Sequence, residues 1–234
     1  MEPHKEVHRI QKIISNRGYC SRRKAEDLIR LGRVSVNGKI ATIGESAPEN
    51  AEIMVEGKKL LPNKKLTIMF NKPVGYITAL TDKFKKTIME FIDVQERVFP
   101  IGRLDQNTSG LLLLTNDGDF ANNVMHPRYE VNKTYEATCD TVISDDIVKK
   151  LKDGMFINDR KVVCKHIKKL SPTRIEISLH EGRKHIVKKV LKECDLHVID
   201  LKRTKIGNLA IGNLKPAHWR ELREDEKKLI WAKN

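Results

Sequence analysis

Apolar residues recur at helical spacing in two stretches near the start of the chain. The first stretch runs from Val7 to Asn16 and meets a stop signal at Gly18. The second begins after Ser21, a residue type that caps helix N-termini, and ends at Gly32. In this second helix we expect four apolar side chains to point inward: Ala25, Leu28, Ile29 and Leu31.

Strand patterns follow these helices. The segment from Val34 to Ile40 contains Asn37-Gly38, a pair favoured in two-residue turns, and therefore predicts a β-hairpin. A second strand pair is expected around residues 53–55 and 60–61. Pro62 to Lys65 is a polar, proline-marked break. We therefore expect an amino-terminal domain of residues 1–61, a linker of residues 62–65 and a larger domain of residues 66–234.

The larger domain mixes strand and helix patterns. Strands are predicted at residues 66–70, 111–114, 133–137, 174–179 and 196–201, and residues 203–209 lead to another strand. Helices are predicted at residues 87–91, 119–125, 144–152 and 224–228. Ser144 is the expected cap of the third, and ion pairs are expected to support the last.

The most distinctive stretch runs from Pro100 to Gly118. A polar loop bracketed by glycines carries Arg103 and Asp105 and leads into four consecutive leucines, which suit a strand buried on both faces. Glycines allow another backbone or a ligand to come close. Because a buried strand is a rigid platform, the loop is a candidate position for a reactive group.

The loop also permits two interpretations without catalysis. Asp105, Asn107 and Ser109 can be ordinary turn residues that hydrogen-bond their own backbone. With Gly110, they also occupy the first positions of an EF-hand calcium loop. Calcium is disfavoured, because the twelfth position is Asn116 instead of a bidentate glutamate.

Composition narrows the class of protein. The 234 residues carry a net charge of +14 and are 39% hydrophobic, which indicates a folded basic protein with an affinity for polyanions and enough length for two domains. No signal segment and no apolar stretch near eighteen residues occurs, so we expect a soluble cytoplasmic protein. Four scattered cysteines are expected to be reduced and mostly buried: Cys20, Cys139, Cys164 and Cys194.

Several segments together carry a family resemblance. The central loop reads Gly102-Arg103-Leu104-Asp105, followed by Thr108, Gly110-Leu111-Leu112 and Thr115-Asn116-Asp117-Gly118. This pattern resembles the catalytic motif of the pseudouridine synthases, and in detail that of the RsuA branch, which modifies ribosomal RNA. Further similar segments are Asn71 to Gly75, Lys133 to Tyr135, Leu179 to Val190 and Pro216 to Leu222.

The resemblance also covers the amino-terminal domain. Residues 7–61 resemble the RNA-binding domain of the ribosomal protein S-four type, so the likeness extends from residue 7 to about residue 226. It implies an α+β fold, in which a small helix-helix-hairpin RNA-binding domain precedes a pseudouridine synthase catalytic domain. The catalytic domain is expected to have a mixed, largely antiparallel sheet, helices on its faces and an RNA cleft across it.

The resemblance assigns roles to individual residues. Asp105 is implied to be the nucleophile, and Tyr135 is implied to stack on the target base and to help move a proton. Without the resemblance, the sequence would predict Tyr135 to be a core or edge aromatic residue of a strand. Lys188 is implied to hold Asp105 ionised, since a nearby cation lowers the pKa of a carboxylate. Ile177 and Leu179 are implied to form the pocket wall.

The sequence departs from the family pattern at three positions. Ile186 stands where glutamine is common, Lys188 replaces a frequent arginine, and Ala217 stands where glycine is usual. A lysine lacks the planar fork of arginine, so the geometry of its ion pair is in doubt.

Two other residue types invite site assignments. A zinc site at His180 and His185 is not expected, because residues five apart lie on different helix faces. Lys72, next to the turn at Pro73 and Gly75, is a weak candidate for a phosphate contact.

The implied RNA contacts are basic residues. Taken alone, the helix arginines could also form a solvated face; as RNA contacts they would position the enzyme through shape and phosphates. The residues are Arg22, Arg23, Arg30, Arg33, Arg103, Arg183 and Lys184.

The implied function is isomerisation of a uridine to pseudouridine in ribosomal RNA, with large-subunit RNA favoured. The target would be flipped out of its helix, and no metal or other cofactor is needed. The alternatives are a synthase for small-subunit ribosomal RNA or transfer RNA, or a non-catalytic ribosome-assembly factor. A hydrolase is disfavoured because no second catalytic acid or metal site is evident. We expect ribosomal RNA or a pre-ribosomal particle as partner, no membrane or obligatory protein partner, and a monomer.

Overall fold

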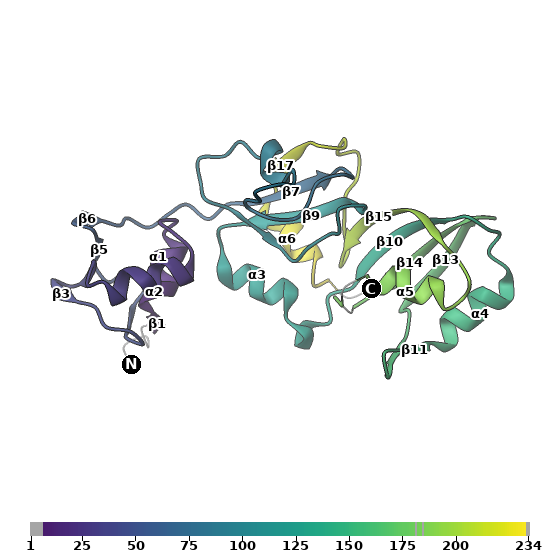
Figure 1. Cartoon of the computed structure of the whole chain (residues 1–234), viewed down its shortest axis with the longest axis horizontal. Coiled ribbons are helices and arrows are strands. Elements are labelled where there is room, and N and C mark those ends of the chain that lie inside the picture. Colours follow the sequence, from purple (N-terminus) through teal and green to yellow (C-terminus); the bar gives the residue numbers. More distant parts are fainter. Residues whose placement is uncertain (1–6, 181, 184, 233–234) are drawn as a thin grey trace. The chain divides into compact units, whose positions relative to one another are not determined.

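The computed structural model describes residues 7–180, 182–183 and 185–232 (Figure 1). These residues form two compact units. The first contains the described residues up to Leu66 together with Val94–Val98 and Asn116–Gly118, and the second contains the rest. The boundary at residues 62–65 therefore stays a prediction, and two short later segments join the first unit. Across the described chain, no helix is long and apolar enough to cross a membrane.

The first unit packs two helices against short strands. Its core consists mainly of buried aliphatic side chains from α1, α2, β2 and β5. A four-stranded sheet has the order β3-β2-β5-β6, and β1 pairs separately with β4. The elements are β1 Val7–Arg9, α1 Ile10–Asn16, α2 Arg22–Arg30, β2 Val34–Val36, β3 Lys39–Ile40, β4 Ser46–Pro48, β5 Ile53–Val55 and β6 Lys58–Lys59.

Local signals in this unit were predicted correctly. The hydroxyl of Ser21 accepts a hydrogen bond from the backbone N–H of Lys24 at 3.3 Å and caps α2. Asn37 and Gly38 both have positive φ, +49° and +80°, as the two central residues of a type I′ turn require. The helix-helix-hairpin arrangement is therefore confirmed.

Three details of this unit were predicted wrongly. Residues Val7–Arg9 form a strand because they pair with Ser46–Pro48, so α1 begins only at Ile10. Leu31 is 64% exposed, since α2 ends at Arg30 and Gly32 turns the chain with φ +66°. The strand that follows β5 is Lys58–Lys59, before the expected position at residues 60–61.

The second unit is built on a nine-stranded sheet. Its main order is β13-β14-β10-β15-β9-β7-β17, with β16 beside β15 and β8 beside β9 (Figure 1). The β15–β9 pair is parallel and the other pairs are antiparallel, which confirms a mixed, largely antiparallel sheet. The strands are β7 Thr67–Lys72, β8 Phe99–Ile101, β9 Ser109–Thr115, β10 Lys133–Cys139, β13 His166–Ser171, β14 Arg174–Leu179, β15 Val198–Ile206, β16 Leu209–Ala210 and β17 Trp219–Glu221.

Helices and a small hairpin complete the chain. The strand expected at residues 196–201 is β15, which runs on to Ile206 because it pairs with both β10 and β9, and the further strand, β16, follows at Leu209–Ala210. The segment at residues 87–91 is a 3₁₀ turn capped by Thr87. The elements are η1 Ile88–Phe91, α3 Gly118–Met125, η2 Pro127–Tyr129, α4 Asp145–Asp153, β11 Met155–Ile157, β12 Arg160–Val162, α5 Ile186–Lys192 and α6 Glu224–Leu229.

Two hydrophobic clusters stabilise this sheet. One joins β10, β14 and β15 to α4 and α5, and the other joins β7 and β9 to α3 and the segment around α6. All four leucines from Leu111 to Leu114 are fully buried, so β9 is covered on both faces as expected. The candidate loop at Asp105 therefore precedes a strand of the fully buried interior.

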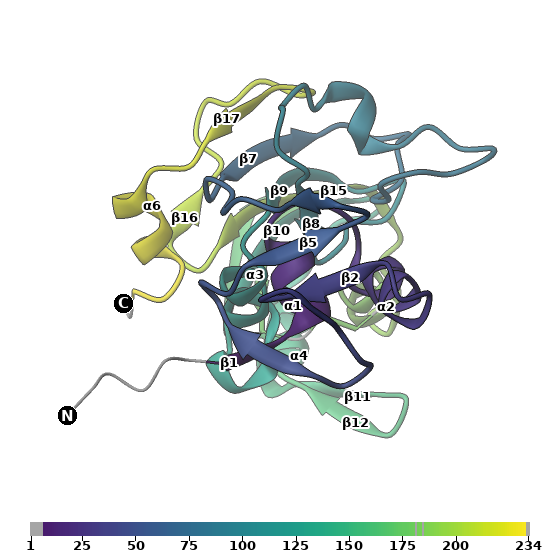
Figure 2. The same cartoon turned by 90° about the vertical axis from the view of Figure 1, so that its left-hand side faces the viewer.

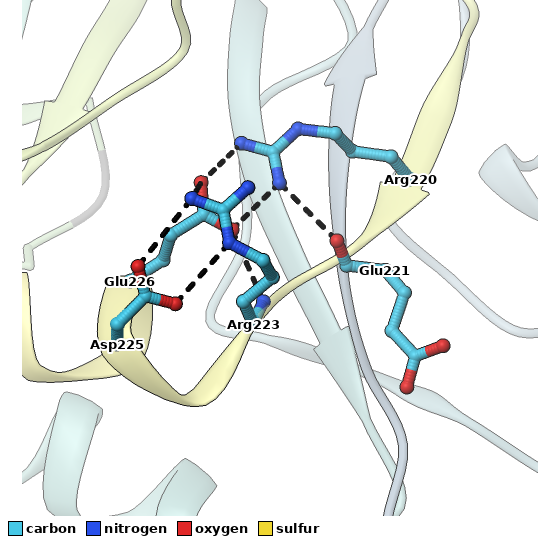
Figure 3. A network of polar contacts seen from close by, with 5 residues as sticks. All are labelled: Arg220, Glu221, Arg223, Asp225 and Glu226. Atoms are coloured by element: carbon cyan, nitrogen blue, oxygen red, sulfur yellow. Dashed lines mark hydrogen bonds and ion pairs between the residues drawn. The ribbon is translucent and has the colours of Figure 1, made fainter.

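A buried carboxylate connects the edge strand β17 to α6. Glu226, only 8% exposed, accepts hydrogen bonds from both terminal nitrogens of Arg220, at 2.8 Å and 2.6 Å (Figure 3). It also accepts one from the backbone N–H of Arg223 at 3.1 Å. These hydrogen bonds, above all those from Arg220, lower the pKa of Glu226 to about 2.

Glu226→Gln should remove a pH-dependent part of the stability. The pKa of Glu226 lies below its ordinary value of 4.5, so its charge stabilises the fold above that value, and the contribution is lost as the pH falls from 4.5 toward 2. We expect the variant to lose at most about 3 kcal/mol of unfolding free energy near neutral pH, and less in acid. Urea unfolding of both proteins over this range measures the difference.

Glu224→Gln is the matched control. Glu224 lies on the same helix and pairs with Lys227 at 2.6 Å, but its side chain is 85% exposed. An exposed pair contributes at most about 1 kcal/mol. Equal losses in the two variants, or a Glu226→Gln loss that does not depend on pH, would contradict the burial argument.

Candidate active site

The loop that carries Asp105 is a tight turn whose backbone is hydrogen-bonded to a buried lysine. The N–H of Thr108 donates to the carbonyl of Asp105 at 3.1 Å and closes the turn. Lys72, the last residue of β7, is fully buried. Its Nζ lies within hydrogen-bonding distance of four carbonyl oxygens, those of Pro73 at 3.0 Å, Asp105 at 3.1 Å, Gln106 at 3.4 Å and Thr108 at 2.9 Å.

The enclosed position of Lys72 changes its pKa. Burial lowers the pKa of the ammonium to about 8, although the carboxylate of Asp105 opposes the shift. An ammonium has three donors, and here they are shared among backbone oxygens. The phosphate contact considered for Lys72 is therefore wrong, because the group is enclosed and its donors are used. Its role in the fold is to fix the backbone around Asp105.

A second segment supports the same loop from the side. The N–H of Gly75 donates to the carbonyl of Gln106 at 2.9 Å, and the Gln106 side chain returns a bond to the Gly75 carbonyl at 3.2 Å. The hydroxyl of Thr78 donates to the carbonyl of Leu104 at 2.7 Å and accepts from its N–H at 3.1 Å. Both neighbours of Asp105 are thus hydrogen-bonded to residues 75–78.

The carboxylate of Asp105 faces a histidine at the start of α5. Its Oδ1 lies 3.1 Å from Nε2 of His185, which forms an ion pair when the imidazole is protonated. The side chains are 37% and 44% exposed, so a ligand can reach both. His185 has a φ of +58° and is the N-cap residue of α5. A carboxylate that is accessible and held on a fixed turn can act as a nucleophile.

One row of residues crosses four strands beside this loop. Gly110 on β9 pairs with Arg203 on β15, Arg203 pairs with Tyr135 on β10, and Tyr135 pairs with Ile177 on β14. A Cβ on Gly110 would lie 2.2 Å from the carbonyl oxygen of Arg203, and Gly110 has a φ of +104°. Only glycine fits this approach.

The row places the expected pocket residues together. Tyr135 is half-buried and packs against the cluster that contains Ile177 and Leu179, both almost fully buried. Leu179 pairs with Lys133, two residues before Tyr135 on β10. Tyr135, Ile177 and Leu179 thus share one region of the sheet, on strands joined through β15 to the strand after Asp105. Their roles toward a substrate stay predictions.

The other expected site residues are more dispersed. Lys188 lies on α5 and is half-buried, and within the described part of the chain no ion pair joins it to Asp105. Arg103 is exposed beside the loop. Arg183 donates to the carbonyl of Ile157 at 3.0 Å, which connects its motif to β11. Lys184 lies outside the described residues.

The four arginines predicted on the first unit are exposed. Arg30 pairs with Asp27 at 3.0 Å, and Arg33 pairs with Glu56 at 2.8 Å. Arg22 and Arg23 lie in the first turn of α2. Such exposed pairs contribute little to stability, so they leave the arginines available to a polyanion.

Sequence analysis did not identify two cations near the row. Arg203 is 4% exposed; its Nε donates to the carbonyl of Leu111 at 2.7 Å. Burial and, to a smaller extent, the charge of Arg203 lower the pKa of Lys133 to about 8. Lys133 opens the segment Lys133 to Tyr135 that resembles the family, but no role was assigned to it. Arg203 had no local signal, because it lies in a strand with other charged residues. Only the strand register brings them together.

Metal ligands are not grouped in the described structure. Among the residues that it describes, no three His, Cys, Asp or Glu side chains are placed to hold one ion. The four cysteines are all free, and three of them are buried, which agrees with the expectation of mostly buried thiols. Burial raises the pKa of Cys164 to about 12, so this thiol is not poised for reaction.

Comparison with protein families identifies both units. Residues 66–193 match the family of RNA pseudouridylate synthases, and residues 8–53 match the S4 domain. A crystal structure of a pseudouridylate synthase superposes with a TM-score of 0.71 and 26% identity, covering 95% of this chain and 99% of that one. The match agrees with the α+β architecture described above.

Similar proteins from other organisms extend along most of the chain. An uncharacterized RNA pseudouridine synthase of Aquifex aeolicus is 44% identical over 93% of this chain and 91% of its own length. Ribosomal large subunit pseudouridine synthase B of Bacillus subtilis is 38% identical over 97% and 96%. Dual-specificity RNA pseudouridine synthase RluF of Escherichia coli K12 is 33% identical over 93% and 76%.

Lys72→Met should loosen the loop at Asp105. The substitution leaves buried carbonyl oxygens without donors, which we expect to lower the unfolding free energy by about 2 kcal/mol. The amide of Thr108 should also exchange its hydrogen faster, because the turn it closes loses support. Urea unfolding and hydrogen exchange measure these two effects, and Lys228→Met, on an exposed face of α6, is the control.

The pH dependence distinguishes this role from simple packing. The folded pKa of Lys72, about 8, lies below its ordinary value of 10.5. The unfolded chain therefore holds more protons between these values, and this group makes the protein more stable as the pH rises through that window. The Lys72→Met variant should not show this increase in stability with pH. A variant as stable as Lys228→Met, with the same pH profile as wild type, would contradict the assignment.

Proposed function

This chain belongs to the RNA pseudouridylate synthase family, in its RsuA branch, and we propose that it isomerises a uridine of large-subunit ribosomal RNA. The observation that carries the proposal is the position of Asp105. The family's aspartate motif falls on a turn whose backbone Lys72 holds, while the carboxylate stays accessible beside His185. Large-subunit RNA is favoured because one similar protein is named for that substrate.

The reaction breaks one bond and forms another within the same nucleotide. With the target uridine flipped out of its helix, Asp105 drives cleavage of the bond between the sugar and the base nitrogen. The base then rotates and rejoins the sugar through C5. The C5 proton is lost and the freed nitrogen gains one, so no water, oxidant or other reagent is consumed.

Tyr135 and the apolar wall would hold the base during this rotation. The aromatic face of Tyr135 offers a stacking surface, and Ile177 and Leu179 exclude water beside it. The tyrosine hydroxyl is a suitable group to move the proton from C5. Tyr135 thus combines the stacking and proton-transfer roles that the family resemblance implies.

The basic residues would position the RNA. Arg103, next to the catalytic turn, would contact the adjoining phosphate or fill the space left by the flipped base. The exposed arginines of the S4 domain would recognise helical RNA through phosphates and shape. The net charge of +14 supports this partner. We propose that the protein acts in the cytoplasm as a monomer without an obligatory protein partner, and that its domains divide at residues 62–65.

Asp105→Asn tests the proposed function. In a strain that lacks the protein, pseudouridine mapping of total RNA should show one ribosomal uridine unmodified. Wild type should restore the modification, and Asp105→Asn should not, because an amide cannot replace the carboxylate as nucleophile. Full restoration by Asp105→Asn would disprove the role of the aspartate. A strain with every ribosomal site still modified would disprove the substrate.

His185→Asn and Lys188→Met together identify the cation that serves Asp105. The resemblance implies Lys188, whereas His185 lies 3.1 Å from the carboxylate. Asparagine tolerates the left-handed backbone of position 185. We expect His185→Asn to lower kcat roughly 10- to 100-fold, since a charge-assisted hydrogen bond is lost.

The two variants are compared at saturating RNA. An unchanged KM and thermal midpoint would separate a role at Asp105 from loss of RNA binding or of fold. If Lys188→Met instead shows the larger loss in kcat, lysine is the partner and the histidine contact is incidental.

A further inference from the structure

The loop between β7 and η1 presents an aromatic side chain to solvent. Phe84 is 94% exposed, the most exposed large hydrophobic residue in the described chain. It is flanked by three exposed lysines, Lys83, Lys85 and Lys86. The loop projects from the body of its unit (Figure 2). A single exposed apolar residue needs no explanation, but an aromatic surrounded by cations has the composition of a surface that binds unpaired nucleic acid.

The tip of this loop is held in a defined shape. The Oδ1 of Asp82 accepts hydrogen bonds from the N–H groups of Phe84 and Lys85, both at 2.9 Å. These two bonds lower the pKa of the Asp82 carboxyl. The Nζ of Lys86 lies 5.9 Å from the centre of the Tyr76 ring. The exposed ring of Phe84 is therefore presented on an ordered turn, which reduces the entropy lost when it binds.

The base of the loop is joined to the catalytic turn. The N–H of Ile77 donates to the carbonyl of Lys86 at 3.0 Å, which closes the loop. The next residue, Thr78, makes both of its hydroxyl bonds with Leu104, the neighbour of Asp105. Phe84 follows Thr78 by six positions in the sequence. The Cα atoms of these two residues are therefore at most roughly 20 Å apart. Phe84 is thus within reach of nucleotides that flank the base at Asp105.

From this arrangement we propose that residues 81–86 are an RNA-binding loop. Phe84 stacks on an unpaired base beside the target, and the lysines contact the neighbouring phosphates. This inference rests on the proposed function, because it takes RNA as the partner. It adds a contact between the catalytic unit and the RNA strand next to the flipped nucleotide. Residues 81–86 lie outside the segments that carry the family resemblance.

Binding of a labelled single-stranded uridine dodecamer to the full chain tests the loop. Fluorescence anisotropy should show that Phe84→Ala binds roughly 5- to 150-fold more weakly than wild type, the range expected for loss of one base–aromatic stack. Phe84→Trp should bind at least as well as wild type. Phe84→Leu should stay weak, since it keeps apolar area without an aromatic face.

Two controls separate stacking from charge and from general surface effects. Phe156→Ala removes another exposed phenylalanine of the same unit, 69% exposed on β11, and should bind as wild type does. Substituting Lys83 and Lys85 together by alanine should lower the salt dependence of binding by about 0.7 in logarithmic slope for each phosphate that the loop no longer neutralises. Phe84→Ala should leave that slope unchanged.

Several outcomes would overturn the loop proposal. These are wild-type binding too weak to measure, Phe84→Ala binding equal to that of Phe156→Ala, and rescue by leucine as complete as by tryptophan. If Phe84→Ala leaves both RNA binding and modification intact, the aromatic tip contacts a protein or nothing. If it weakens binding while wild type modifies no ribosomal RNA, the loop proposal stands and the proposed function fails.

Discussion

The buried ammonium of Lys72 is the interaction on which the rest of the site depends. Enclosing a cation costs free energy unless its donors are satisfied, and here backbone carbonyls of the Asp105 turn satisfy them. The cost of burial and the geometry of the turn are therefore coupled. If the turn changes shape, the ammonium loses its acceptors. This coupling is a physical reason for a lysine as the last residue of a buried strand, next to the Asp105 loop.

The sheet adds a second constraint on the same loop. The strand that follows Asp105 lies so close to β15 that Gly110 cannot carry a side chain. This approach puts Arg203 beside the start of β9 and connects it, through the ladder, to Tyr135. The expected nucleophile, the stacking residue and the apolar wall are thus held by strands of one sheet. A site that must guide a rotating base benefits from such a rigid frame.

Among the basic side chains, one group is buried and another is exposed. Two cations of the second unit are buried and donate to backbone carbonyls, Lys72 to the Asp105 turn and Arg203 to Leu111. The four arginines predicted to contact RNA on the S4 domain and the lysines around Phe84 are exposed. In the proposed function, the exposed cations exchange counterions for phosphates. The buried cations instead hold the backbone near Asp105 and Leu111, so the two sets of basic residues differ in their surroundings.

The sequence by itself determined the features that have local causes. Four consecutive leucines predicted the buried strand β9, Asn37-Gly38 predicted the hairpin turn, and Ser21 and Ser144 predicted two helix caps, because each signal acts within a few residues. Resemblance to a family located Asp105 and Tyr135 on the chain. The helical period failed at Val7, where pairing with a strand some forty residues later decided the backbone.

Only the tertiary structure decided which groups meet. Lys72 and its three acceptors on the Asp105 turn are 33 to 36 residues apart, and His185 reaches Asp105 from another element eighty residues later. No periodicity records such contacts, since they depend on strand register and on the backbone conformation at the start of α5. The motif identified Asp105 as the expected nucleophile, but the packing of β7, β9 and α5 determined its neighbours.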